Sequence, residues 1–188
     1  MSHKGRGEDK VGAAMAKRPT SAVLALALLL SGALAAGAEP GAPENRELPA
    51  TSSDELGERA KLLFDAVVQG KPELADDFFF PREPFLVLKD VRDPSRYHAE
   101  LLSSYHRGIR DLHARRRSWE GATFRSFELG TTPRWVKPGE EWNKIGYHRT
   151  YRGKIRYVVA GHERTIEVHT LISWDGRWYV THLQPIHH

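Results

Sequence analysis

The dipeptide Asp175-Gly176 is the feature that most constrains what this chain can fold into. A pair of this kind is typical of a two-residue type I′ turn between antiparallel strands. Strand-forming residues flank it on both sides, so we expect a β-hairpin whose register is fixed by the turn. In that register Ile172 lies opposite Tyr179, and His169 lies opposite His182.

A second turn, within residues 160–163, is expected to join this hairpin to a third strand that begins near Tyr147. Counting back from this turn places Val159 opposite Arg164 and Ile155 opposite Val168. Because side chains alternate along a strand, the three strands have two distinct faces, and we expect the first face to meet the core. This first face carries Tyr151, Ile155, Tyr157, Val159, Ile166, Val168, Thr170, Ile172, Tyr179, Thr181 and Leu183.

The second face of the same strands is polar at one end and apolar near the Asp175-Gly176 turn. An exposed apolar patch usually marks a partner surface. We therefore expect a homodimer interface on this face, with the interface residues Leu171, Trp178, Val180, His169 and His182. A loop between Trp135 and Trp142 that covers the patch is the alternative.

The N-terminal segment has the layout of a secretory signal peptide. Lys17 and Arg18 precede an apolar run over residues 22–30, and small residues follow it, so we expect cleavage after Ala35 or Ala38. An uncleaved membrane anchor is the alternative, which the short run and its small residues disfavour. The protein is therefore expected to be periplasmic or secreted, with no membrane attachment after cleavage.

The leader also sets the expected domain organisation. Residues 1–38 form the signal peptide, and Met15 is the expected true start because the preceding segment is polar and has no evident role. Residues 39–53 are rich in Pro, Ala, Glu and Ser, which is typical of a disordered spacer. Residues 54–188 are expected to form one domain.

Charge and cysteine content exclude some functions. The 188-residue chain has 28 basic and 24 acidic residues, but five of the basic and two of the acidic residues lie in the leader. The remainder is nearly neutral, so a nucleic-acid partner is not expected. The chain has no cysteine, and an exported domain of this size buries about 70% of its unfolded surface, enough for a core without disulfides.

Helical patterns precede the strands. One helix is expected from Ser52 or Ser53 to Gly70, and a short one from Pro72 to Phe79, with the aromatic run 78–80 at a junction of elements. Residues 85–88 are expected to form a short strand or turn.

A long third helix is expected to begin with Asp93 as its N-cap and to end at the arginines 115–117. His98 falls within the apolar arc of this helix. Two further strands are expected over residues 123–129 and 134–137.

This order of elements, closed by the hairpin sequence Trp-Asp-Gly-Arg-Trp-Tyr-Val-Thr-His-Leu at 174–183, resembles the NTF2-like superfamily, also called SnoaL-like or cystatin-like α+β. The resemblance covers residues 54–185 and contains no catalytic signature. It implies an α+β fold in which a curved antiparallel sheet wraps around the N-terminal helices as a cone. It also implies a small-molecule pocket at the mouth of the cone and dimers formed through the outer face.

The leading functional hypothesis is an exported binding or assembly module, dimeric, with a small apolar pocket in the cone. The first face contains hydroxyls and aliphatic side chains but no carboxylate, which disfavours a carboxylate-driven isomerase. The expected pocket residues are His98, Tyr105, Tyr157, Thr170, Tyr179 and Thr181.

The alternative is an enzyme that uses the same pocket, a hydrolase, dehydratase or isomerase of a small apolar molecule. In this hypothesis His98 is the general base and Tyr157 or Tyr179 donates a proton. It requires His98 to point into a cavity; a packed, hydrogen-bonded core histidine is the competing interpretation.

No cofactor or metal is expected. The sequence has no glycine-rich phosphate loop and no metalloprotease motif. An opposed His169 and His182 would supply two zinc ligands but lack a clear third.

Overall fold

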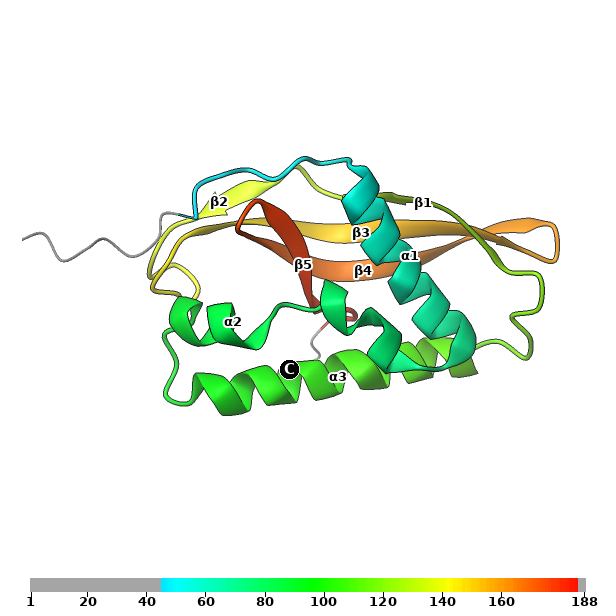
Figure 1. The fold of residues 1–188 in the computed structure, drawn as a ribbon, viewed down its shortest axis with the longest axis horizontal. Helices are drawn as coiled ribbons and strands as arrows, with labels where there is room; N and C mark the ends of the chain where they lie inside the picture. Colours follow the sequence, from blue (N-terminus) through cyan, green and yellow to red (C-terminus); the bar gives the residue numbers. More distant parts are fainter. Residues whose placement is uncertain (1–44, 186–188) are drawn as a thin grey trace, which may run out of the picture. The chain divides into compact units, whose positions relative to one another are not determined.

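The computed structural model describes residues 45–185, which form an α+β fold with helices first and an antiparallel sheet after them (Figure 1). The expected signal peptide, Met15 and the first part of the expected spacer lie outside the described residues. The elements are α1 (Asp54–Gln69), the 3-10 helix η1 (Pro72–Phe78), α2 (Arg82–Leu88), α3 (Pro94–Ala114), β1 (Thr123–Glu128), β2 (Arg134–Val136), β3 (Tyr147–Val159), β4 (His162–Trp174) and β5 (Arg177–His182).

The long helices begin and end where their capping residues dictate. The Ser53 hydroxyl accepts the Leu56 N–H at 3.2 Å, and Gly70 ends α1 in the left-handed region at φ 66°, which glycine adopts without strain. The Asp93 side chain accepts the Arg96 N–H at 2.9 Å at the start of α3, as predicted. Ser53, rather than Ser52, is therefore the cap of α1.

The expectation of a strand or turn at residues 85–88 is wrong, because these residues belong to α2. Pro81 precedes this helix and Pro84 lies in its first turn, where proline is compatible with helical backbone. The helix buries Phe85 and Leu88, which are three residues apart and so share one face.

The sheet is ordered β1-β3-β4-β5, and β2 pairs with the other end of β3. The turn between β3 and β4 consists of Ala160 and Gly161, both at positive φ, so Val159 pairs with His162 and Ile155 with Ile166. The predicted partner of Val159, Arg164, is thus wrong by two positions. A shift of two leaves every side chain on its predicted face, because the side-chain period of a strand is two.

The pairing of β4 with β5 departs from prediction at one point. Ile172 pairs with Tyr179 as predicted, but a bulge then brings Thr170 opposite His182 and leaves Thr181 as the extra residue. The predicted pairing of His169 with His182 is therefore wrong. The His169 N–H instead donates to the Leu183 carbonyl at 3.2 Å.

The segment before α1 makes specific contacts that a disordered spacer does not make. The Asn45 side-chain amide donates to the Ser173 carbonyl at 2.9 Å and to the Gly146 carbonyl at 3.2 Å. Further along, the Trp178 indole N–H donates to the Ala50 carbonyl at 3.1 Å. Residues 45–53 are therefore fixed against the sheet, which corrects the expectation for this part of the spacer.

The aromatic run 78–80 is buried at a junction of elements, as predicted. Phe79 forms a parallel bridge with Val180, and the Phe80 N–H donates to the Val180 carbonyl at 3.0 Å. The Phe78 ring packs edge-on against Phe127 of β1. The connection between η1 and α2 thus covers the outer edge of β5.

Arg59 of α1 joins three elements from a buried position. Its guanidinium donates to the Trp178 carbonyl at 2.9 Å and to the Asp77 carbonyl at 2.6 Å. It also lies 4.4 Å from the Tyr179 ring centroid. A planar fork with several donors suits this task better than an ammonium does.

We predict that Arg59→Met lowers the free energy of unfolding by about 2–4 kcal/mol, because the buried Trp178 carbonyl and the partly buried Asp77 carbonyl lose their donor. The matched control is Lys61→Met, which removes an exposed cation paired with Asp65 on the same helix and should change stability by less than about 0.5 kcal/mol. Urea unfolding of both variants measures the difference. Equal effects of the two substitutions would contradict the bridging role of Arg59.

Candidate functional site

The residues expected to form an exposed dimer patch are buried within the chain. Leu171 and Val180 are 0% exposed and Trp178 is 1% exposed. Trp178 is covered by the segment that contains Ala50, and the Val180 carbonyl is bonded to Phe80. The expectation of an apolar interface at these three residues is therefore wrong, and the expected homodimer stays a prediction without an assigned surface.

His98 is a packed histidine of α3. It is 7% exposed, and its Nε2 donates to the Phe80 carbonyl at 2.8 Å. The rings of Phe79 and Phe85 lie edge-on to the imidazole, at 5.4 and 5.2 Å between centroids. The Nε2 of His98 therefore forms a hydrogen bond that connects α3 to the segment between η1 and α2.

The three residues of the catalytic alternative do not converge on one site. His98 and Tyr179 border a pocket of about 250 Å³ beside Arg59. Tyr157 lies elsewhere and packs against Phe64 of α1 and Trp119, at 5.3 and 5.7 Å between centroids. The arrangement therefore does not support the proposed base and donor set.

The other expected pocket residues are also distributed over different places. The Tyr105 hydroxyl donates to the Ala75 carbonyl at 3.2 Å beneath η1, in a fully buried position. Thr170 and Thr181 line a pocket of about 310 Å³ between α2, α3 and the sheet, called here the main pocket. The structure thus places two of the six expected residues in the main pocket.

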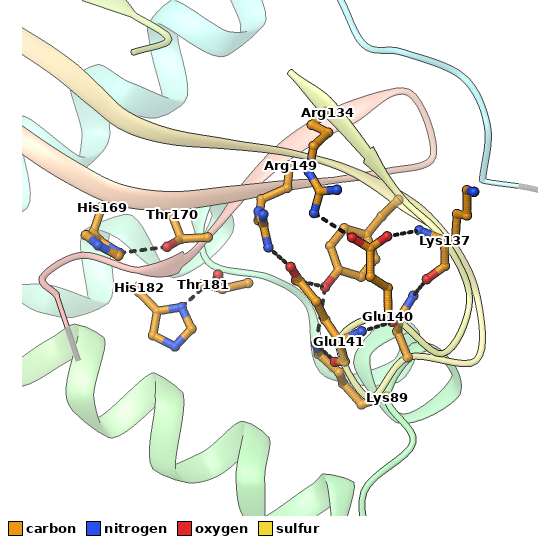
Figure 2. Close-up of polar contacts among 12 residues, drawn as sticks. Lys89, Arg134, Lys137, Glu140, Glu141, Arg149, His169, Thr170, Thr181 and His182 are labelled. Atoms are coloured by element: carbon orange, nitrogen blue, oxygen red, sulfur yellow. Dashed lines mark hydrogen bonds and ion pairs between the residues drawn. The ribbon is translucent and has the colours of Figure 1, made fainter. Parts of the chain in front are cut away.

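One end of the main pocket holds a cluster of ionisable groups, called here the cationic cluster: Lys89, Glu141, Tyr147 and Arg149 (Figure 2). The Tyr147 hydroxyl donates to a Glu141 carboxylate oxygen at 2.7 Å, and Arg149 forms an ion pair with the same carboxylate. The Lys89 ammonium donates to the Glu141 backbone carbonyl at 3.3 Å and to the Tyr147 hydroxyl at 3.4 Å.

The loop between β2 and β3 positions this cluster. Buried Asn143 accepts the Glu141 N–H at 2.8 Å and donates to the Lys137 and Ile145 carbonyls at 3.0 and 2.9 Å. The loop is fastened to the end of α2 by a bridge between Asn143 and Lys89. Lys89 and Glu141 are therefore held by backbone geometry as well as by their side chains.

Burial dominates the electrostatics of the cationic cluster. Desolvation, together with the neighbouring charge of Arg149, lowers the pKa of Lys89 to about 8. Burial also raises the pKa of the Tyr147 hydroxyl well above its usual value. The Arg149 Nε is buried and has no hydrogen-bond partner among the described residues.

The other end of the main pocket holds two imidazoles, His169 and His182, called here the imidazole pair. The His169 Nδ1 lies 2.8 Å from the Thr170 hydroxyl, and the His182 Nδ1 lies 3.1 Å from the Thr181 hydroxyl (Figure 2). The bulge in β5 brings both His182 and Thr181 to the pocket wall.

The imidazole pair is uncharged at neutral pH. Burial, followed by the charges of His169 and Lys89, lowers the pKa of His182 to about 4, and burial lowers the pKa of His169 as well. The His182 Nε2 is buried without a hydrogen-bond partner among the described residues. The main pocket therefore has one charged end and one neutral polar end.

The sequence interpretation missed all four residues of the cationic cluster and predicted an apolar pocket. Tyr147 and Arg149 share the first face with Tyr151, so continuing the alternation of β3 toward its start would have identified both. Lys89 and Glu141 lie outside regular elements, where no periodic signal exists. The expected apolar pocket is corrected to one with a cationic end.

Two further observations limit the site. Within residues 45–185, no three His, Asp or Glu side chains lie close enough together to hold a metal ion. None of the helices in this range is long and apolar enough to cross a membrane.

Comparisons with family models, with curated proteins and with solved structures each found no match.

We predict that Lys89→Met stabilises the folded protein at pH 7, by up to about 3 kcal/mol, because it removes a buried ammonium. The folded-state pKa of Lys89 lies below its ordinary value of 10.5. Between pH 8 and 10.5 the unfolded wild-type chain therefore holds one more proton, and wild-type stability rises toward that of the variant.

Urea unfolding of both proteins at pH 7, 9 and 10.5 measures this convergence. Lys144→Met is the matched control, since Lys144 is an exposed cation 3.9 Å from Asp90. A constant difference between wild type and Lys89→Met across this range would contradict the burial of a charged Lys89.

Proposed function

We propose that the chain is an NTF2-like ligand-binding module whose binding site is the main pocket. The observation that carries the proposal is that Arg149 and His182, which line the two ends of this pocket, each hold a buried nitrogen (Arg149 Nε and His182 Nε2) with no hydrogen-bond partner among the described residues. Buried polar atoms in native proteins nearly always have a partner. A ligand with acceptors for these nitrogens would complete both ends.

The walls between the two ends fit the same proposal. Phe85 of α2 and Leu101 of α3 contribute apolar surface on one side of the main pocket, and Ile172 of β4 contributes it on the other. A cavity of a few hundred Å³ that combines apolar walls with fixed polar groups is the usual form of a small-molecule site.

The wider assignments belong to this proposal. An N-terminal set of helices followed by an antiparallel sheet agrees with the NTF2-like cone at the level of element order. Export to the periplasm or beyond the cell, and a homodimer in solution, remain predictions from the sequence. The bond from the His98 Nε2 to the Phe80 carbonyl disfavours His98 as the general base of the enzyme alternative.

The test is a fragment screen by two-dimensional NMR. We predict that small amphipathic molecules at millimolar concentration shift the amide signals of Lys89, Tyr147 and residues 169–172. The amides of Arg82 and Arg177, which line the separate pocket beside Arg59, serve as the internal control and should not move. Shifts confined to that second pocket, or no shifts at all, would contradict the proposal.

A further inference from the structure

We propose that the ligand of the main pocket is a monocarboxylate, with its head group between Lys89 and Arg149 and its apolar body along Phe85, Leu101 and Ile172. This inference rests on the proposed function and adds the chemical class of the ligand. It starts from the charges that the cationic cluster leaves unbalanced.

The charges that line the main pocket do not balance. At neutral pH the main pocket contains the cations of Lys89 and Arg149 and one carboxylate, Glu141, and the imidazole pair is neutral. The lining therefore carries one net positive charge in a partly desolvated space. A monoanion neutralises it, whereas a phosphate monoester near its dianionic state would leave an excess negative charge.

The two cations of the main pocket, Lys89 and Arg149, are incompletely paired. Glu141 pairs with a terminal nitrogen of Arg149, and the Arg149 Nε is buried with no hydrogen-bond partner among the described residues. Within the described residues Lys89 forms no ion pair, and its two hydrogen bonds, at 3.3 and 3.4 Å, go to neutral oxygens. A partly buried ammonium without a counter-ion is unfavourable, so a carboxylate from the ligand would satisfy both groups.

Polarity is unevenly distributed along the main pocket. Beyond the cationic cluster the walls combine the apolar side chains named above with the hydroxyls of Tyr97, Tyr151, Thr170 and Thr181, and the far end carries the uncharged imidazole pair. A second anionic group would find no cation there. An elongated ligand with one carboxylate and an apolar body, with or without a neutral polar tail, fits this order of groups.

The experiment compares octanoate with 1-octanol and octylamine, which share one alkyl chain and differ in the charge of the head group. Isothermal titration calorimetry of the full chain at pH 7 measures the three affinities. We expect octanoate to bind at least about tenfold more tightly than 1-octanol. Octylamine should bind more weakly than 1-octanol, because its charge is repelled.

Variants locate the head group. Lys89→Met and Arg149→Gln should each reduce octanoate affinity about tenfold and leave 1-octanol affinity within about threefold. Retained binding of 1-octanol shows that a variant is folded, and Arg149→Lys tests the charge without the guanidinium geometry. Lys144→Met is the matched control, an exposed cation outside the main pocket, and should leave octanoate binding unchanged.

The pH dependence gives an independent test. The titratable and charged groups that line the main pocket with Lys89 come from several elements: Tyr97 from α3, Glu141 from the loop before β3, Tyr147, Arg149 and Tyr151 from β3, His169 from β4 and His182 from β5. Burial raises the pKa of the Tyr97 and Tyr147 hydroxyls and lowers the pKa of His182 to about 4, whereas the pKa of Lys89, at about 8, falls between pH 7 and 9. Octanoate affinity should therefore fall over this range in the wild type and stay constant in Lys89→Met.

The outcomes separate the two proposals. Equal affinities for octanoate and 1-octanol, or tighter binding of octylamine, would overturn the carboxylate assignment and leave the main pocket as a binding site. Tighter binding of octyl phosphate than of octanoate would overturn the assignment of a single negative charge. Failure of all these probes to bind would overturn the carboxylate inference, while failure of the fragment screen as well would overturn the proposed function.

Discussion

The antiparallel ladder between β3 and β4 is the interaction on which the rest of the structure depends. It runs from the pair Arg149–Ile172 to the pair Val159–His162 in one register, and the Ala160-Gly161 turn closes it. Because the register is continuous, a single face of β3 serves two purposes. Near the turn, Ile155 belongs to the buried core, while at the start of the strand Arg149 reaches the main pocket. Hydrophobic packing at one end of the ladder thus fixes the position of the charges at the other.

Helices and loops then turn this ladder into an enclosed site. Arg59 joins α1 to β5 and η1, and the Phe80 backbone pairs with the outer edge of β5. The loop held by Asn143 fastens the end of α2 to the start of β3, which brings Lys89 next to Glu141 (Figure 2). The cationic cluster is therefore assembled from segments far apart in sequence. The geometry of the cationic cluster therefore depends on tertiary contacts that also pack the fold.

The sequence predicted most of the secondary structure because local chemistry determines it. Ser53, Gly70 and Asp93 cap helices for reasons visible in a few neighbouring residues. The misses have equally physical causes. The bulge at Thr181 arises from the three-dimensional pairing of β4 and β5, and no residue pattern in the sequence predicts it. Trp178 was expected on the surface because a two-face pattern shows which side chains align, but not that the segment containing Ala50 covers the second face.

The candidate site was harder to predict than the fold, because its residues break the pattern that identifies a fold. An apolar first face predicts an apolar pocket, but the same face carries the charged Arg149 near the start of β3, and Lys89 lies outside the strands, where no alternation exists. Burial of a lysine without a counter-ion weakens the folded state, and proteins concentrate such unfavourable groups at functional sites. If a carboxylate ligand neutralises Lys89, ligand binding also removes part of that unfavourable energy and stabilises the folded chain beyond the effect of its apolar contacts. Stability and binding are then coupled through one ammonium group, and the same burial that depresses its pKa strengthens its attraction for a desolvated anion.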